Sequence, residues 1–190
     1  RARNADLVEE LEQLSREDPL TSLGNLRAWD EVLTASYLTA RRTGRPLSVL
    51  IVDVDRFKSI NDLGGHVLGD SALRAIAQVL REVVSPPCFV ARPGGDEFAI
   101  VCPGTPLTAA AELAREIHHG FRGHPLLERL AATCSIGVAE LEAADSSTAS
   151  LYRRADAAMY QAKGVGGRTC CAEFGQASVS ERSVTGSTGR

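Results

Sequence analysis

The chain has 190 residues, a formal net charge of −3 and 44% hydrophobic residues, enough for one ordinary folded domain with short appendages. It has no strongly basic tract, so we do not expect it to bind nucleic acid through a broad positive surface. It also has no signal peptide and no apolar run of about 18 residues, so we expect a cytoplasmic segment without direct membrane contact. Because the chain begins with Arg1 rather than Met, we expect a longer parent protein, with a sensor domain or membrane anchor upstream.

The first 17 residues predict a helix. Leu7, Leu11 and Leu14 recur at helical spacing among Glu, Gln and Arg residues and form one apolar stripe. This stripe fits a surface helix that docks on its own domain, and it also fits the end of a parallel coiled coil that enters from an upstream module. Pro19 ends the helix, because proline lacks a backbone donor and restricts the residue before it.

Apolar periodicity and breaker residues predict alternating helices and strands beyond Pro19. Short, nearly continuous apolar runs indicate buried strands, and longer runs with helical spacing indicate helices. In chain order we expect a helix from Asn25 to about Arg42, a strand Leu47–Val54, a short helix Asp55–Asp62 closed by Gly64 and Gly65, a long helix that Asp70 caps and that runs through Val84, a hairpin from Cys88 to Cys102, a helix Leu107–Gly120, a strand Leu130–Glu140, a helix from Ser147 or Thr148 through Lys163, and a final edge strand Arg168–Phe174.

This alternation predicts one α/β (α+β) domain over residues 18–174. Residues 175–190 are rich in Ser, Gly and Thr and predict a disordered tail or a linker. The five cysteines include no CxxC pair, so we expect reduced thiols, most of them buried in strands, rather than a zinc site.

The run Gly94-Gly95-Asp96-Glu97-Phe98 carries the clearest chemical signal. It lies between two apolar segments and predicts a hairpin with Pro93-Gly94-Gly95 at its tip. The two glycines leave room for a bulky anionic ligand beside the backbone, and the acids that follow can hold a hard cation against it. Asp53, at the end of a buried strand, is placed to add a further carboxylate. Taken alone, Asp53 and Asp55 could equally do no more than end that strand.

These segments, in this order, resemble the GGDEF family of diguanylate cyclases. The resemblance covers residues 18–174 and rests on the signature run together with Asp53-Val54-Asp55-Arg56-Phe57-Lys58, Asn61-Asp62, Gly65-His66-Val67-Leu68-Gly69-Asp70, Ser135-Ile136-Gly137-Val138 and the segment from Ala155 to Lys163. It implies a central, mostly antiparallel five-stranded sheet flanked by helices, similar to nucleotide cyclases and polymerase palms. It also favours the coiled-coil interpretation of residues 1–17, as an N-terminal signalling helix.

The resemblance also implies roles for individual residues. Asp53, the Val54 carbonyl and Asp96 would bind Mg²⁺ (or Mn²⁺), and Glu97 would share in metal binding and take the proton of the attacking hydroxyl. Asn61 and Asp70 would read guanine, whose paired donor edge adenine lacks, although Asp70 could instead cap its helix. Phe57 and Leu73 would form walls of the base pocket. Gly94 and Gly95 would lie beside the phosphates. The phosphate charge would be neutralised by Lys58, Lys163 and Arg168, and Arg168 would act across a loop that is one residue longer than usual in the family.

The function implied is condensation of two GTP molecules into cyclic di-GMP and two pyrophosphates at the interface of a homodimer. Two alternatives are a module that binds GTP and regulates a partner, and a purely structural dimerisation domain. The family's RxxD inhibitory site is replaced by Ser85-Pro86-Pro87-Cys88, so we expect no product inhibition there. Within the family's first motif, Ser22 stands in place of a glycine and Leu26 in place of an arginine.

Overall fold

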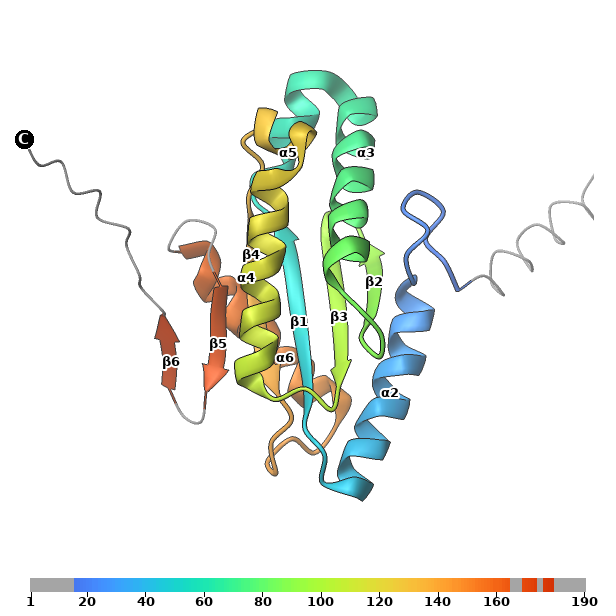
Figure 1. The fold of residues 1–190 in the computed structure, drawn as a ribbon, viewed down its shortest axis with the longest axis vertical. Helices are drawn as coiled ribbons and strands as arrows, with labels where there is room; N and C mark the ends of the chain where they lie inside the picture. Colours follow the sequence, from blue (N-terminus) through green and yellow to red (C-terminus); the bar gives the residue numbers. More distant parts are fainter. Residues whose placement is uncertain (1–15, 165–168, 174–175, 180–190) are drawn as a thin grey trace, which may run out of the picture.

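The computed structural model describes residues 16–164, 169–173 and 176–179 (Figure 1). The N-terminal leucine stripe and Arg168 lie outside these ranges. The elements are α2 (Leu26–Thr43), β1 (Leu47–Val54), α3 (Phe57–Val83), β2 (Phe89–Gly94), β3 (Glu97–Pro103), α4 (Leu107–Gly123), α5 (Pro125–Arg129), β4 (Cys134–Glu140), α6 (Thr148–Gly164), β5 (Thr169–Glu173) and β6 (Gln176–Val179).

One sheet runs through the molecule in the strand order β2-β3-β1-β4-β5-β6. The β4–β5 pair is parallel and the other pairs are antiparallel, which confirms a mostly antiparallel sheet. The expected count of five strands is wrong, because β6 adds a sixth from the segment that we expected to be a tail. An edge strand is held by backbone hydrogen bonds and needs few apolar side chains. The polar composition of this segment therefore did not indicate that β6 is a strand. β5 is accordingly an inner strand rather than the edge.

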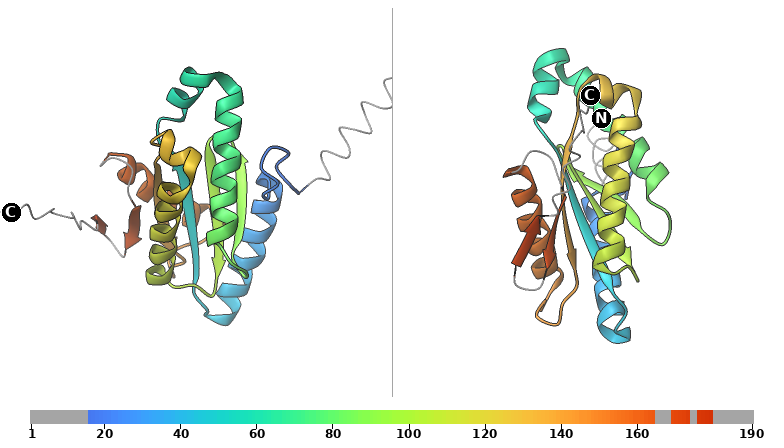
Figure 2. Two further views of the ribbon diagram at one scale, coloured as in Figure 1. Left: turned by 45° about the horizontal axis from the view of Figure 1, so that its top comes forward. Right: turned by 60° about the vertical axis from the view of Figure 1, so that its left-hand side comes forward.

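Helices cover both faces of the sheet, as Figure 2 shows for α6 and α4 on either side of β1. Leu50 and Val52 of β1 face a core that includes residues of α3, α4 and α5, whereas Val49 and Ile51 face α2 and α6. Residues of both sets are fully buried. This double cover explains why β1 is a continuous apolar run. Among the described residues, no helix has the length and apolar character needed to cross a membrane.

The ends of α2 follow the sequence prediction. The Asn25 side chain accepts a hydrogen bond from the backbone N–H of Ala28, and Gly44 closes the helix in the left-handed region at φ 68°. In α3 the break at Gly64 and Gly65 is also confirmed. Helical backbone resumes directly after Gly65, however, so Asp70 lies within the helix and does not cap it. The reason is that Gly64 and Gly65, the latter at φ 68°, confine the break to two residues.

Two other boundaries differ from the prediction. The turn of the β2–β3 hairpin is formed by Gly95 and Asp96, while Pro93 and Gly94 belong to β2 beyond a bulge. Gly95 has φ +56°, the positive value that a tight hairpin turn requires of a first turn residue. The strand that we expected to begin at Leu130 begins at Cys134, because Pro125–Arg129 forms the short helix α5.

Helix α6 packs unusually close to β4. A Cβ atom added at Gly137 would lie 2.0 Å from the carbonyl oxygen of Ala155 and 2.2 Å from the backbone nitrogen of Met159. Only glycine permits this contact between a helix backbone and a strand backbone. Gly137 therefore sets the depth at which α6 lies on the sheet, and with it the positions of the α6 side chains Tyr152 and Lys163.

Candidate active site

Three polar residues share one rung at the end of the sheet where β1 ends. Asp53 of β1 is paired with Glu97 of β3 on one side and with Ser135 of β4 on the other. Directly opposed residues of antiparallel strands present their side chains on the same face. The hairpin turn lies at this same end (Figure 1), and the backbone N–H of Val54 donates to the carbonyl oxygen of Asp96 at 3.2 Å. The structure thus brings together Asp53, Val54, Asp96 and Glu97.

Lys163, at the end of α6, makes an ion pair with Asp53 across 2.9 Å. Burial raises the pKa of the Asp53 carboxyl, and the carboxylates of Asp96 and Asp55 raise it further, so that Lys163 only partly offsets the shift. Burial lowers the pKa of Lys163, but its bond to Asp53 and the nearby acids outweigh this and leave that pKa raised. The site therefore carries negative charge that one ammonium group does not neutralise.

The donor set at this end of the sheet fits a divalent cation. Within the described residues, no three His, Cys, Asp or Glu side chains lie close enough together to hold a metal by themselves. Two carboxylates and a backbone carbonyl are a partial shell, of the kind that Mg²⁺ completes with water and substrate phosphate oxygens. The ammonium of Lys163 already shows that the Asp53 carboxylate accepts a cation here.

Asp55 has a different environment from Asp53. Its carboxylate accepts hydrogen bonds from the hydroxyls of Thr133 at 2.6 Å and Ser135 at 2.7 Å, and its backbone N–H donates to the Thr133 carbonyl at 2.9 Å. Asp55 therefore ties the end of β1 to the start of β4. Thr133 could not be predicted as a partner of Asp55, because a single threonine in a loop forms no recognisable pattern.

A second group of predicted site residues lies on α3. A Cβ atom added at Gly69 would lie 2.0 Å from Oδ1 of Asn61 and 3.2 Å from Cζ of Phe57. Asn61 and Phe57 therefore converge over Gly69, the neighbour of Asp70. Leu73 is buried in the hydrophobic core against which Phe57 packs, and the exposed Lys58 lies on the same helix. Since Asp70 caps no helix, its carboxylate is available for a ligand.

The tip of the hairpin is open. A Cβ atom added at Gly94 or Gly95 would have no neighbouring atom within 4 Å, so both glycines border free space. Arg92 stabilises the turn from β2: its guanidinium donates to the Gly95 carbonyl at 2.7 Å and pairs with Asp18 at 2.9 Å. Sequence reasoning missed this contact, although an arginine two residues before a glycine pair was a usable signal.

Glu97 has a partner that sequence reasoning also missed. The hydroxyl of Tyr152, on α6, donates to Oε1 of Glu97 at 2.8 Å. Burial raises the pKa of Tyr152, and the bond to Glu97 raises it further. An aromatic residue in an amphipathic helix is typical of core packing, so its position in the sequence carries no sign of this role.

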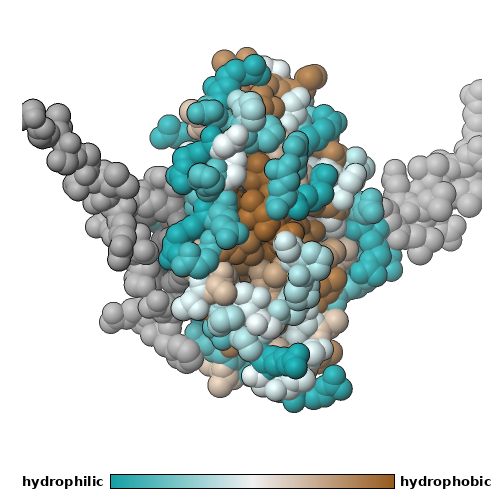
Figure 3. Space-filling model, viewed as in Figure 1, coloured by the Kyte–Doolittle hydropathy of each residue, from teal (hydrophilic) through white to brown (hydrophobic). Residues whose placement is uncertain are grey.

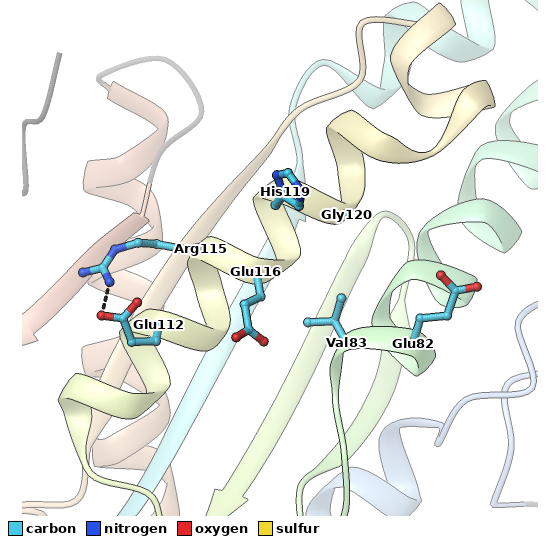
Figure 4. Close-up of a pocket in the computed structure, with 7 residues that line it drawn as sticks. All are labelled: Glu82, Val83, Glu112, Arg115, Glu116, His119 and Gly120. Atoms are coloured by element: carbon cyan, nitrogen blue, oxygen red, sulfur yellow. Dashed lines mark ion pairs between the residues drawn. The ribbon is translucent and has the colours of Figure 1, made fainter. Parts of the chain in front are cut away.

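A groove between α3 and α4 lies near the segment Ser85–Cys88, away from the rung that Asp53, Glu97 and Ser135 share. Its volume is about 500 Å³, and it runs beside an apolar strip of the surface in Figure 3. Figure 4 shows that acidic side chains line it, among them Glu82, Glu112 and Glu116, with Arg115 paired to Glu112. Three carboxylates against one guanidinium make this groove unfavourable for an anionic ligand.

The family model described as "Diguanylate cyclase, GGDEF domain" matches residues 15–169 of this chain. A diguanylate cyclase of Vibrio cholerae is 39% identical over 168 residues, covering 87% of this chain and 52% of that protein. Diguanylate cyclase DgcP of Pseudomonas aeruginosa is 36% identical over 162 residues, covering 84% of this chain and 24% of the relative. The chain thus spans about half or less of the length of these curated relatives.

Solved structures are similar over most of the chain. The GGDEF domain of DgcB from Caulobacter crescentus, in complex with c-di-GMP, superposes with a TM-score of 0.78 at 35% identity, covering 84% of this chain and 97% of the other. The diguanylate cyclase SiaD of Pseudomonas aeruginosa, in complex with its activator SiaC, superposes with a TM-score of 0.75 at 29% identity, covering 90% of this chain and 66% of the other.

Proposed function

Because the chain belongs to the GGDEF family of diguanylate cyclases, we propose that it condenses two GTP molecules into cyclic di-GMP and releases two pyrophosphates. The observation that carries the proposal is the rung on which Asp53 faces Glu97, with Lys163 bound to Asp53. The hairpin turn adds Asp96 beside this rung. Carboxylates, a lysine and open glycines at one end of a sheet are what a reaction on nucleoside triphosphates needs.

Diguanylate cyclases of this family use a divalent metal ion, and we assign Mg²⁺ or Mn²⁺ to this chain. Asp53, the carbonyl of Val54 and Asp96 would hold it. When bound, it supplies charge neutralisation at the phosphate and lowers the pKa of the attacking hydroxyl. The raised pKa of Asp53 and its pairing with Lys163 support this assignment, because both reflect a carboxylate that lacks sufficient positive charge.

The substrate would lie between the rung and α3. Asn61 and Asp70 would recognise guanine by its donor and acceptor edge, and Phe57 and Leu73 would contact the base. The phosphates would extend toward Gly94 and Gly95, where no side chain fills the space. Lys58, Lys163 and Arg168 would neutralise them; Lys163 is 40% exposed, so its ammonium group can turn from Asp53 toward a phosphate oxygen.

The chemical step joins two domains. The 3′-oxygen of one GTP forms a bond to the α-phosphorus of the other, the bond from that phosphorus to the pyrophosphate oxygen breaks, and Glu97 accepts the hydroxyl proton. Repeating the step in the opposite sense closes the ring. A homodimer is therefore required, and we propose that residues 1–17 form the stalk that aligns its two domains under the control of an upstream sensor domain. Because GTP is a cytoplasmic nucleotide, we place the domain in the cytoplasm.

We expect no product inhibition at the position of the family's RxxD motif. Ser85-Pro86-Pro87-Cys88 offers neither a guanidinium nor a carboxylate, and the nearby groove carries Glu82, Glu112 and Glu116. An anionic dinucleotide would meet repulsion there. Titration of the protein with cyclic di-GMP tests this expectation, and low-micromolar binding that disappears when Ser85 and Cys88 are changed would contradict it.

Incubation of the purified chain with GTP and Mg²⁺, followed by chromatography and mass identification of the products, tests the proposed function. We expect cyclic di-GMP and pyrophosphate from the native chain and neither from Glu97→Gln. Tight GTP binding without product, even at high protein concentration, would instead indicate a regulatory GTP-binding module.

A further inference from the structure

Tyr152 makes a contact that nothing in the proposed chemistry so far requires. Its hydroxyl donates to Oε1 of Glu97 at 2.8 Å. Within the part of the chain that the structure describes, the Glu97 side chain makes this one hydrogen bond. The bond joins two residues that are 55 positions apart in the chain. A hydrogen bond to a charged acceptor is stronger than one between neutral groups. The bond therefore fixes one oxygen of the carboxylate and leaves the other for the reaction.

Packing of its ring and its backbone holds the Tyr152 hydroxyl in place. The ring of Tyr152 packs edge-on against Trp29 of α2, with ring centroids 6.5 Å apart and planes at 70°. Its backbone belongs to α6, which Gly137 holds against β4 at a distance that admits no side chain. A side chain held by packing on two regular elements keeps its direction within narrow limits, so the hydroxyl presents one fixed donor to Glu97.

Glu97 needs such a donor because of its neighbours. It faces Asp53 across the β1–β3 pair, and Asp96 precedes it in the turn, so like charges repel its carboxylate from the site. A glutamate has three side-chain torsions and many orientations to lose. Without the hydrogen bond from Tyr152, nothing in the described residues would fix the orientation of this carboxylate.

We propose that Tyr152 is a positioning residue for the cyclase reaction, holding the Glu97 carboxylate in the orientation in which it accepts the proton of the attacking hydroxyl. The inference rests on the proposed function. It concerns the orientation of Glu97 and not the binding of GTP, because Tyr152 lies beneath the rung in the core shared by α2 and α6. Its loss should therefore reduce turnover and leave substrate binding intact.

The test compares two variants that each remove one tyrosine hydroxyl. Tyr152→Phe keeps the ring and its contact with Trp29. Tyr37→Phe is the matched control, since Tyr37 packs against the same core and its hydroxyl donates to the carbonyl of Asp145 at 2.9 Å, outside the site. We expect Tyr152→Phe to lower kcat about ten-fold with KM for GTP changed less than about two-fold, given the strength of a hydrogen bond to a charged acceptor. Tyr37→Phe is expected to change neither.

A second measurement does not depend on activity. The shift in denaturation midpoint caused by Tyr152→Phe is compared in the native chain and in a Glu97→Ala background. We expect the shift to shrink in that background, because the acceptor is already missing. Equal shifts would show that the hydroxyl and the carboxylate do not interact, and would overturn the proposal.

The activity data separate the remaining outcomes. A native kcat in Tyr152→Phe would overturn the positioning role, and so would a loss that appears in KM alone. If the native chain makes no cyclic di-GMP, the proposed function itself fails and the positioning role fails with it. If the native chain makes cyclic di-GMP and Tyr152→Phe makes it with the same kcat, the proposed function stands and the proposed role of Tyr152 is wrong.

Discussion

Arg92 connects Asp18 to the turn of the hairpin that carries Asp96. Its guanidinium lies 3.0 and 2.9 Å from the two carboxylate oxygens of Asp18, and a further nitrogen donates to the Gly95 carbonyl at 2.7 Å. Asp18 is the first residue after the segment in which we expect the N-terminal stalk. A displacement of that segment would therefore be transmitted to the turn through the Arg92 side chain.

Asp18→Asn tests this connection. Burial raises the pKa of Asp18, but hydrogen bonds from Thr21 and Arg92 outweigh it and leave the pKa lowered. A lowered folded-state pKa contributes stability that is present above the unfolded value and is lost as the pH falls through the folded value. We expect Asp18→Asn to cost about 1–2 kcal/mol at pH 7, measured by urea unfolding, with a smaller difference from the native chain below about pH 4. An equal difference at both pH values would contradict the charge assignment.

Asp53→Asn is expected to stabilise the metal-free chain while abolishing activity. The pKa of Asp53 is raised on folding, so the favourable contribution is present below its unfolded value and is lost as the pH rises through the folded value. At neutral pH the ionised carboxylate therefore opposes folding, and a neutral amide removes that cost while still accepting from Lys163. Thermal unfolding without metal gives the first comparison. Addition of Mg²⁺ should then raise Tm for the native chain and not for the variant; an equal rise in both would place the metal elsewhere.

Ser22→Gly is expected to raise stability. Ser22 adopts φ 55°, a left-handed conformation that strains a residue with a side chain, and it stands where the family has a glycine. Relief of this strain should exceed the entropy cost of glycine and give about 0.5 kcal/mol. The matched control Ser36→Gly, inside α2, should lower stability instead. Urea midpoints that shift in the same direction for both variants would show that Ser22 is unstrained.

Gly69→Ala is expected to weaken GTP binding. The added methyl would lie 2.0 Å from Oδ1 of Asn61, so the Asn61 amide must move from its position above Gly69. We expect KM for GTP to rise about ten-fold, the loss of roughly one hydrogen-bonded contact to the base. Gly123→Ala is the control, because a Cβ atom there meets nothing within 4 Å. Unchanged GTP affinity in Gly69→Ala would remove Asn61 from the base site.

Local patterns were sufficient to predict much of the fold. β1 is a buried apolar run and Asn25 caps the start of α2, and both were predicted because the signal lies within the segment itself. The turn at Gly95 and Asp96 was placed within two residues. Strand β6 was missed because its pairing with β5 depends on backbone groups and not on side chains.

The site was predictable where acids and glycines stand in a fixed order, and not where the contact spans the chain. The resemblance to the GGDEF family picked out Asp53, Asp96 and Glu97, and the structure brings them together. The contacts of Tyr152 with Glu97 and of Arg92 with Asp18 join residues 55 and 74 positions apart. Such pairs form only when distant segments pack together in the folded chain, so no pattern within a single segment predicts them.

The most direct measurement is the rate of cyclic di-GMP formation per domain, taken over a range of protein concentrations with GTP and Mg²⁺, for the native chain and for Glu97→Gln. We expect the native rate per domain to rise with concentration, because each product needs two domains, and the variant to give no product at any concentration. A native chain that binds GTP but yields no cyclic di-GMP, even when a fused coiled coil enforces dimerisation, would contradict the proposed cyclase.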